Sequence, residues 1–83
     1  MANFRRVKLY TVENCRYCDL ARNLLARHGV QYEELNVSDN HLARAEMASA
    51  SHQFGVPVLA VNDEIYVGFD RVAYEEALKI REA

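Results

Sequence analysis

The sequence is short of the features that mark secreted, membrane-spanning and nucleic-acid-binding proteins. Its 83 residues include two cysteines, one proline and three glycines, and its net charge is −2 from 10 basic and 12 acidic side chains. Two cysteines are too few for a disulfide-dense secreted scaffold, and no apolar run approaches the ~20 residues of a transmembrane helix. The near balance of charge gives no reason to expect a polyanionic partner. We expect one domain over residues 1–83, a monomer with no membrane or nucleic-acid partner.

The first residues do not match a secretory signal peptide. Residues 1–6 include two arginines, but Lys8 and Glu13 interrupt the apolar stretch that such a peptide carries after its charged start. Arg5, Arg6 and Lys8 also lack the interleaved aromatic side chains typical of a nucleic-acid-binding face. We therefore expect a cytoplasmic protein.

The hydrophobic pattern of the first half predicts a β-α-β unit followed by a helix. A strand is expected at residues 7–11 and a helix at residues 15–28, which Gly29 ends as a left-handed cap. A second strand is expected at residues 30–37, and residues 38–40 offer N-caps for a second helix. The side chains predicted to face the core are Tyr17, Ala21, Leu24, Leu25 and His28 on the first helix and Ala43, Met47, Ala50 and Phe54 on the second.

The second half predicts a β-hairpin and a last helix. Strands are expected at residues 56–61 and 65–67, joined by a tight turn at residues 62–64 and ended by Gly68. Asp70 is placed to cap the last helix. The apolar face of that helix is Ala73, Tyr74, Ala77 and Leu78. A right-handed crossover makes the first two strands parallel and the short turn makes the last two antiparallel, which predicts an α/β fold with a four-stranded mixed sheet and three helices.

The two cysteines lie where the first strand gives way to the first helix, in the sequence Cys15-Arg16-Tyr17-Cys18. With the helix beginning at Cys15, Cys18 lies one turn along the same face, so the two sulfurs can meet. Unpaired N–H groups of the first turn point at Cys15 and favour its thiolate. The helix dipole alone contributes only about 0.3–1 kcal/mol, so the positive charge of Arg16 is expected to add to the stabilisation of the thiolate. Cys15 is therefore predicted to attack a disulfide, and Cys18 to resolve the mixed disulfide.

Other roles for the pair remain open from the residues alone. A lone CxxC supplies half of a structural zinc site, for which His28, His41 and His52 are the remaining candidates, although no second CxxC completes the set. The rival class is a non-catalytic metal or iron–sulfur module, with cysteine ligands from two chains and glutathione. Two incidental buried thiols are the third alternative.

The single proline follows a glycine at the start of a predicted strand. Because only about 5% of X–Pro bonds are cis, Val56-Pro57 taken alone favours a trans proline. A CxxC pair upstream of a hairpin that opens with this proline favours the cis bond instead.

Together these segments resemble the glutaredoxin family of the thioredoxin fold. The resemblance covers nearly the whole chain and rests on Leu9-Tyr10-Thr11, Cys15-Arg16-Tyr17-Cys18, Gly55-Val56-Pro57 and Gly68-Phe69-Asp70. It implies the order β-α-β-α-β-β-α, strand order 2-1-3-4, and a cis Val56-Pro57 bond that faces the cysteines. It also implies a thiol–disulfide oxidoreductase without bound metal or cofactor, which reduces protein disulfides or glutathione mixed disulfides.

The resemblance further assigns a substrate site, in which the backbone of Val56 pairs with an incoming cysteinyl peptide. The residues that it implies for this site are Arg16, Tyr17, Gln53, Val56, Pro57, Gly68 and Asp70. Gln53 and Asp70 match positions that hold the two ends of glutathione. Val12, in contrast, stands where glutathione-using members typically carry a lysine, so one anchor for a carboxylate is missing.

Two further comparisons bear on the electron donor. Arg16 replaces the proline of the family's usual Cys-Pro-Tyr-Cys, a change that bears on the reduction potential. Tyr10-Thr11 and Gly68-Phe69 are also similar to the glutaredoxin-like hydrogen donors of ribonucleotide reductase, which thioredoxin reductase reduces. The implied donor is therefore glutathione or thioredoxin reductase.

Overall fold

The computed structural model describes residues 6–79, and the elements within them follow the predicted order. They are β1 (Val7–Thr11), α1 (Arg16–Arg27), β2 (Glu33–Asn36), α2 (His41–Ser51), β3 (Val58–Val61), β4 (Glu64–Val67) and α3 (Arg71–Leu78). The strands pair in the order β2-β1-β3-β4, with β1 parallel to β2 and antiparallel to β3, and β3 antiparallel to β4. The predicted strand order and orientations are confirmed. No helix among the described residues is long and apolar enough to cross a membrane.

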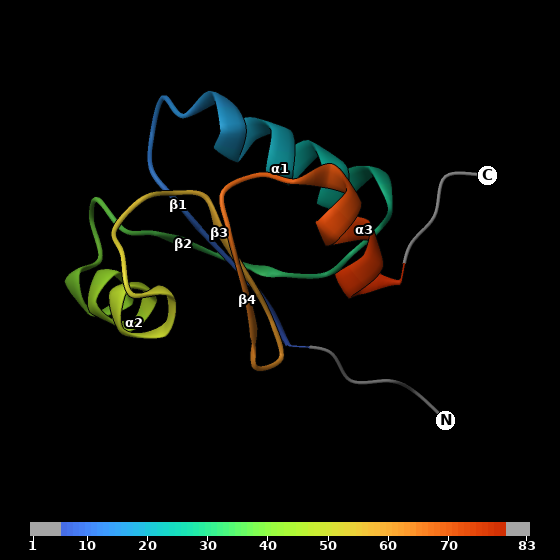
Figure 1. Cartoon of the computed structure of the whole chain (residues 1–83). Helices are drawn as coiled ribbons and strands as arrows, with labels where there is room; N and C mark the ends of the chain where they lie inside the picture. The colour runs from blue at the N-terminus through green and yellow to red at the C-terminus, as the bar shows by residue number, and fades with distance from the viewer. Residues whose placement is uncertain (1–5, 80–83) are drawn as a thin grey trace.

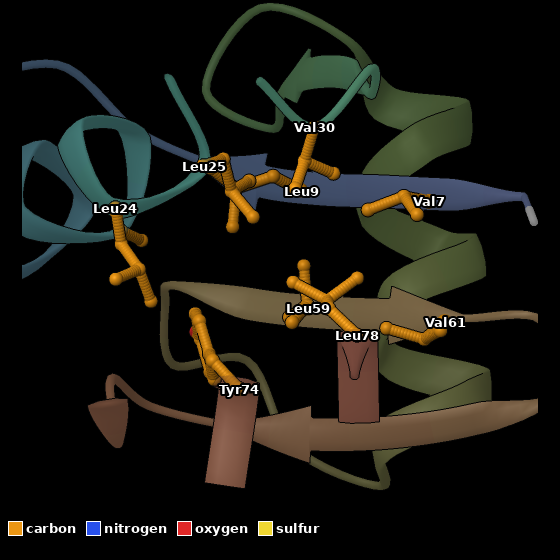
Figure 2. Close-up of a cluster of buried hydrophobic side chains, with 10 residues drawn as sticks. Val7, Leu9, Leu24, Leu25, Val30, Leu59, Val61, Tyr74 and Leu78 are labelled. Carbon is orange, nitrogen blue, oxygen red and sulfur yellow. The ribbon is translucent and has the colours of Figure 1, made fainter. Parts of the chain in front are cut away.

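The sheet separates two hydrophobic clusters. Helices α1 and α3 cover one face and α2 covers the other (Figure 1). Because successive residues of a strand point to opposite faces, Leu9 and Leu59 enter the cluster under α1 and α3, whereas Tyr10 and Val58 enter the cluster under α2. Figure 2 shows the first cluster, in which side chains from β1, β3 and both helices point toward one another.

The two strands that pair with β1, which are β2 and β3, are shorter than the sequence predicts. β2 begins at Glu33, which pairs with Lys8 near the start of β1. Only Val7 precedes Lys8 in β1, so the residues before Glu33 have almost no neighbouring strand to pair with. Val30 instead packs into the cluster under α1 and α3. β3 begins at Val58, directly after Pro57, which has no N–H to contribute to the sheet. The predicted left-handed Gly29 is confirmed, with a φ of 66°.

Two aromatic side chains predicted to face the core are exposed. Tyr17 is 60% exposed, and Cys18 takes the inward position at the start of the stripe that continues with Ala21. Phe54 is 59% exposed because His52, with a φ of 60°, ends α2 in a left-handed turn, after which the helical period no longer applies. Ala50, also predicted inward, is exposed.

Candidate active site

The ends of three strands meet at one edge of the sheet. Tyr10 pairs with Val58, and Val58 pairs with Val67, so the end of β1 and the end of β4 flank the start of β3. Gly68, which follows β4, donates its N–H to the carbonyl oxygen of Pro57 at 2.7 Å. The loop before α1, the loop before β3 and the loop after β4 therefore lie at the same end of the sheet (Figure 1).

At this edge, α1 begins on a cysteine that caps the helix. Cys15 has extended backbone angles, and its Sγ accepts a hydrogen bond from the N–H of Cys18 at 3.1 Å. The two sulfurs are joined in a disulfide, with the Cα atoms 5.2 Å apart. Cys15 is half-buried, whereas Cys18 is 0% exposed. The pair is therefore asymmetric, because only the sulfur of the first cysteine can be reached from solvent.

The acidic side chains near the start of α1 are paired with other groups. Glu13 accepts a hydrogen bond from the side chain of Asn36 at 3.4 Å, so its carboxylate is held toward β2. Arg22 forms ion pairs with Asp19 and with Glu34, the latter at 2.7 Å. The hydrogen bond that Arg22 donates to Glu34 is the main cause that raises the pKa of Arg22 above its ordinary value. Arg16 is exposed beside the cysteines.

The segment before β3 contains the cis Val56–Pro57 bond. The side chain of Gln53 is bonded inside this segment: Oε1 accepts from the N–H of Gly55 at 2.5 Å, and Nε2 donates to the carbonyl of Gly55 at 3.1 Å. Nε2 also donates to the hydroxyl of Ser51 at 3.0 Å. The sequence identified the cis bond, whereas Ser51 carries no signal in the sequence that would have placed it here.

The start of α3 lies at the same end of the sheet, after the loop that follows β4. Asp70 caps the helix, since its Oδ1 accepts from the N–H of Ala73 at 3.2 Å. Tyr74 donates its hydroxyl to the carbonyl of Gly68 at 2.6 Å, and burial raises the pKa of this hydroxyl above its ordinary value. Phe69 packs edge-on against Tyr74, with ring centroids 5.3 Å apart. The sequence pattern predicted Tyr74 as a core residue, and periodicity gives no sign of its polar contact.

The predicted site residues thus fall into two groups. Cys15, Arg16, Tyr17 and Cys18 begin α1, and Val56, Pro57, Gly68 and Asp70 line the neighbouring strand ends. Gln53 lies in the same segment as Val56, with its amide turned inward onto the backbone of its own loop.

A metal site does not form around the cysteines in the described part of the chain. Among residues 6–79, no group of three or more His, Cys, Asp or Glu side chains is placed to hold an ion. Among these residues, none of His28, His41 and His52 forms such a group with Cys15 and Cys18.

A mixed four-stranded sheet whose CxxC pair caps a helix beside a cis proline defines a dithiol protein of the thioredoxin fold. The sequence model of the glutaredoxin family matches residues 7–66. Glutaredoxin 3 of Escherichia coli is 37% identical over 70 residues, which cover 84% of this chain and 81% of that protein. The chain belongs to the glutaredoxin family, and its activity is that of a thiol–disulfide oxidoreductase.

Solved structures agree on the fold. A glutaredoxin from Archaeoglobus fulgidus superposes with a TM-score of 0.83 at 21% identity, covering 93% of this chain and 89% of that one. The glutaredoxin-like NrdH-redoxin from Escherichia coli gives a TM-score of 0.73 at 24% identity, covering 94% of this chain and 97% of that one. In both comparisons, the similarity extends over nearly the full length of the two chains compared.

Proposed function

We propose that Cys15 is the attacking thiol and Cys18 the resolving thiol of a dithiol exchange that reduces disulfides. The observation that carries this assignment is the difference in burial, because Cys15 is half-buried while Cys18 is 0% exposed. A substrate disulfide therefore meets the first sulfur only. The second sulfur is placed for an intramolecular step, since the structure already holds the Cys15–Cys18 disulfide that this step produces.

The exchange balances as a transfer of two electrons. The Cys15 thiolate attacks one substrate sulfur, forms a mixed disulfide and releases the other substrate sulfur as a thiolate, which takes up a proton. Cys18 then loses its proton and attacks the Sγ of Cys15, which frees the remaining substrate thiol. The N–H of Cys18 already points at the Sγ of Cys15 at 3.1 Å, so a donor for the anionic sulfur is in place before the reaction begins.

The substrate is proposed to bind along the loop before β3, between the starts of α1 and α3. The backbone of Val56 would pair with the peptide that carries the disulfide. Tyr17, which precedes Cys18 and is 60% exposed, is proposed to border the bound substrate. The full set assigned to the substrate site is Arg16, Tyr17, Gln53, Val56, Pro57, Gly68 and Asp70. Protein disulfides and glutathione mixed disulfides are the proposed substrates.

Two electron donors fit the family, glutathione and thioredoxin reductase. Val12 offers no charge to a glutathione carboxylate and instead packs against the cluster under α2. Asp70 retains its carboxylate at the start of α3. Such a dithiol functions in a reducing compartment, and we propose the cytoplasm and a monomeric state.

The test supplies NADPH with either glutathione and glutathione reductase or thioredoxin reductase alone, and follows the reduction of insulin disulfides. We expect turnover in at least one arm, and the arm that sustains it identifies the donor. Absence of turnover in both arms, or equal turnover by Cys15→Ser, would overturn the proposal. Inactive protein that carries iron and colour after anaerobic purification would support the iron–sulfur alternative instead.

A further inference from the structure

The backbone on both sides of Val56 is held by hydrogen bonds, while that of Val56 itself is not. Gly55, which precedes Val56, is bonded through both its N–H and its carbonyl to the side-chain amide of Gln53. Pro57, which follows Val56, accepts the N–H of Gly68 through its carbonyl at 2.7 Å. Within residues 6–79, neither the N–H nor the carbonyl of Val56 has a hydrogen-bond partner. The proposed substrate-pairing residue is therefore free to pair between two fixed neighbours.

The hydrogen bonds on the Gly55 side are anchored in α2. The hydroxyl of Ser51 accepts from Nε2 of Gln53 at 3.0 Å and lies 2.7 Å from the carbonyl oxygen of Met47, to which it donates. Met47 is fully buried in the cluster under α2. Gln53 thus connects the last turn of α2 to the backbone next to Val56.

The hydrogen bonds on the Pro57 side are anchored in α3. Tyr74 donates its hydroxyl to the carbonyl of Gly68 at 2.6 Å, and Gly68 in turn donates to Pro57. The ring of Tyr74 is fully buried in the cluster under α1 and α3. The two anchors therefore lie in the two separate clusters, on opposite faces of the sheet.

Gly55 is fitted to the side chain of Gln53. A Cβ at Gly55 would lie 2.7 Å from Oε1 of Gln53, closer than such atoms approach. The φ of Gly55 is outside the left-handed region, so any residue could adopt its backbone conformation. The glycine is therefore needed for space, since a side chain here would push the Gln53 amide off the backbone.

We propose that Gln53 and Tyr74 are positioning residues that fix the backbone of Val56 for pairing with the substrate peptide. Gln53 acts through Gly55, because both N–H protons of its amide are already donated, to Ser51 and to Gly55. This inference rests on the proposed function, in which Val56 pairs with substrate. It predicts selectivity for extended peptides recognised by their backbone, over small disulfides that do not pair with Val56.

The experiment compares Gln53→Met, Gly55→Ala and Tyr74→Phe with the wild type on two substrates, a protein disulfide (insulin) and a small aromatic disulfide. Gln53→Met keeps the size of the side chain without its hydrogen bonds, and Gly55→Ala keeps Gln53 but displaces its amide. We expect KM for insulin to rise about threefold to tenfold in each, the effect of one or two lost hydrogen bonds, and the loss of activity on the small disulfide to be smaller than the loss on insulin. Gln31→Met, at an exposed position before β2, is the matched control and should change neither.

Two results would overturn the proposal. One is an unchanged KM for insulin in both Gln53→Met and Gly55→Ala. The other is an equal loss on both substrates, which would mean that the variants damage the dithiol itself. A separate readout is amide hydrogen exchange at Gly55, which should speed up in Gln53→Met whether or not the protein reduces insulin. Inactive wild type would therefore refute the proposed function, while slow exchange retained at Gly55 in Gln53→Met would refute the positioning role.

Discussion

The starts of α1 and α3 follow strand ends at the same end of the sheet as Pro57 and are built alike, yet only one of them carries a reactive group. In each, the capping side chain accepts the N–H of the residue three positions further on, at 3.1 Å for the sulfur of Cys15 and at 3.2 Å for the carboxylate of Asp70. The carboxylate of Asp70 does not attack disulfides, whereas the sulfur of Cys15 can do so as a thiolate once the protein is reduced. The capping position is common to both helices, and the chemistry follows from the atom that occupies it.

The two helix starts also differ in the residue whose N–H donates to the capping side chain. The residue that donates to Cys15 is Cys18, a second thiol that is fully buried and already joined to the first. The residue that donates to Asp70 is Ala73, which has no reactive group. With a single cysteine, the start of a helix could form a mixed disulfide with a substrate but could not resolve it within the same chain. At the start of α1, the second cysteine allows the mixed disulfide to be resolved and the substrate thiol to be released.

The largest effect is expected at Cys15, whose side chain both caps α1 and serves as the proposed nucleophile. Two substitutions there distinguish these roles. Cys15→Ser and Cys15→Ala should both lose all disulfide reduction, because neither supplies a thiolate. Serine still accepts the N–H of Cys18, so under reducing conditions Cys15→Ala should be less stable than Cys15→Ser by about 1 kcal/mol. Insulin reduction and urea unfolding with a reductant present measure the two quantities. Activity retained by Cys15→Ser would contradict the assignment, and equal stabilities would show that the cap contributes nothing.

A smaller effect is expected at the start of α3. Asp70→Ala should lower the free energy of unfolding by about 1 kcal/mol through loss of the cap, and should also lower kcat/KM for a glutathione mixed disulfide severalfold. Asn40→Ala is the matched control, because Asn40 caps α2 in the same way, with its Oδ1 accepting from the N–H of Ala43 at 3.0 Å. It should cost as much stability and leave kcat/KM within about twofold. If both variants lose activity equally, Asp70 acts through stability alone.

The smallest effect is expected from a charged side chain on α2, which covers the opposite face of the sheet from α1 and α3 (Figure 1). Tyr10 donates to Glu46 at 2.5 Å, and this hydrogen bond, with a further one from Lys8, lowers the pKa of Glu46. A lowered folded-state pKa adds stability above the ordinary carboxyl pKa, and that stability is lost as pH falls through the folded value. Wild type should therefore exceed Glu46→Gln by less than about 1 kcal/mol at pH 7, with the difference vanishing in acid. Urea midpoints across this range, with unchanged insulin reduction, would check it; an activity loss would contradict it.

Periodicity and motif spacing predicted the order of elements, the strand orientations, the cap at Asp70 and three cap candidates, residues 38–40, of which the structure uses Asn40. They failed for Tyr17 because Tyr17 and Cys18 lie four and three positions before Ala21, so both fit the helical period and the sequence pattern did not choose between them. They failed for Phe54 because the left-handed turn at His52 ends the helical period before it. The roles of Gln53 and Tyr74 in holding the loop were also outside their reach. Those contacts depend on where a side-chain amide and a hydroxyl point, which spacing does not encode.

Cys15 is expected to react with substrate disulfides directly, and Cys18 is not. The most direct measurement is the rate at which each single-cysteine variant forms a mixed disulfide with an aromatic disulfide that releases a coloured thiolate, at pH 7 and with mass spectrometry of the adduct. Cys18→Ser should react rapidly and form a one-to-one adduct at Cys15. Cys15→Ser should react far more slowly, because Cys18 is buried. Equal rates in the two variants, or a faster reaction at Cys18, would contradict the account.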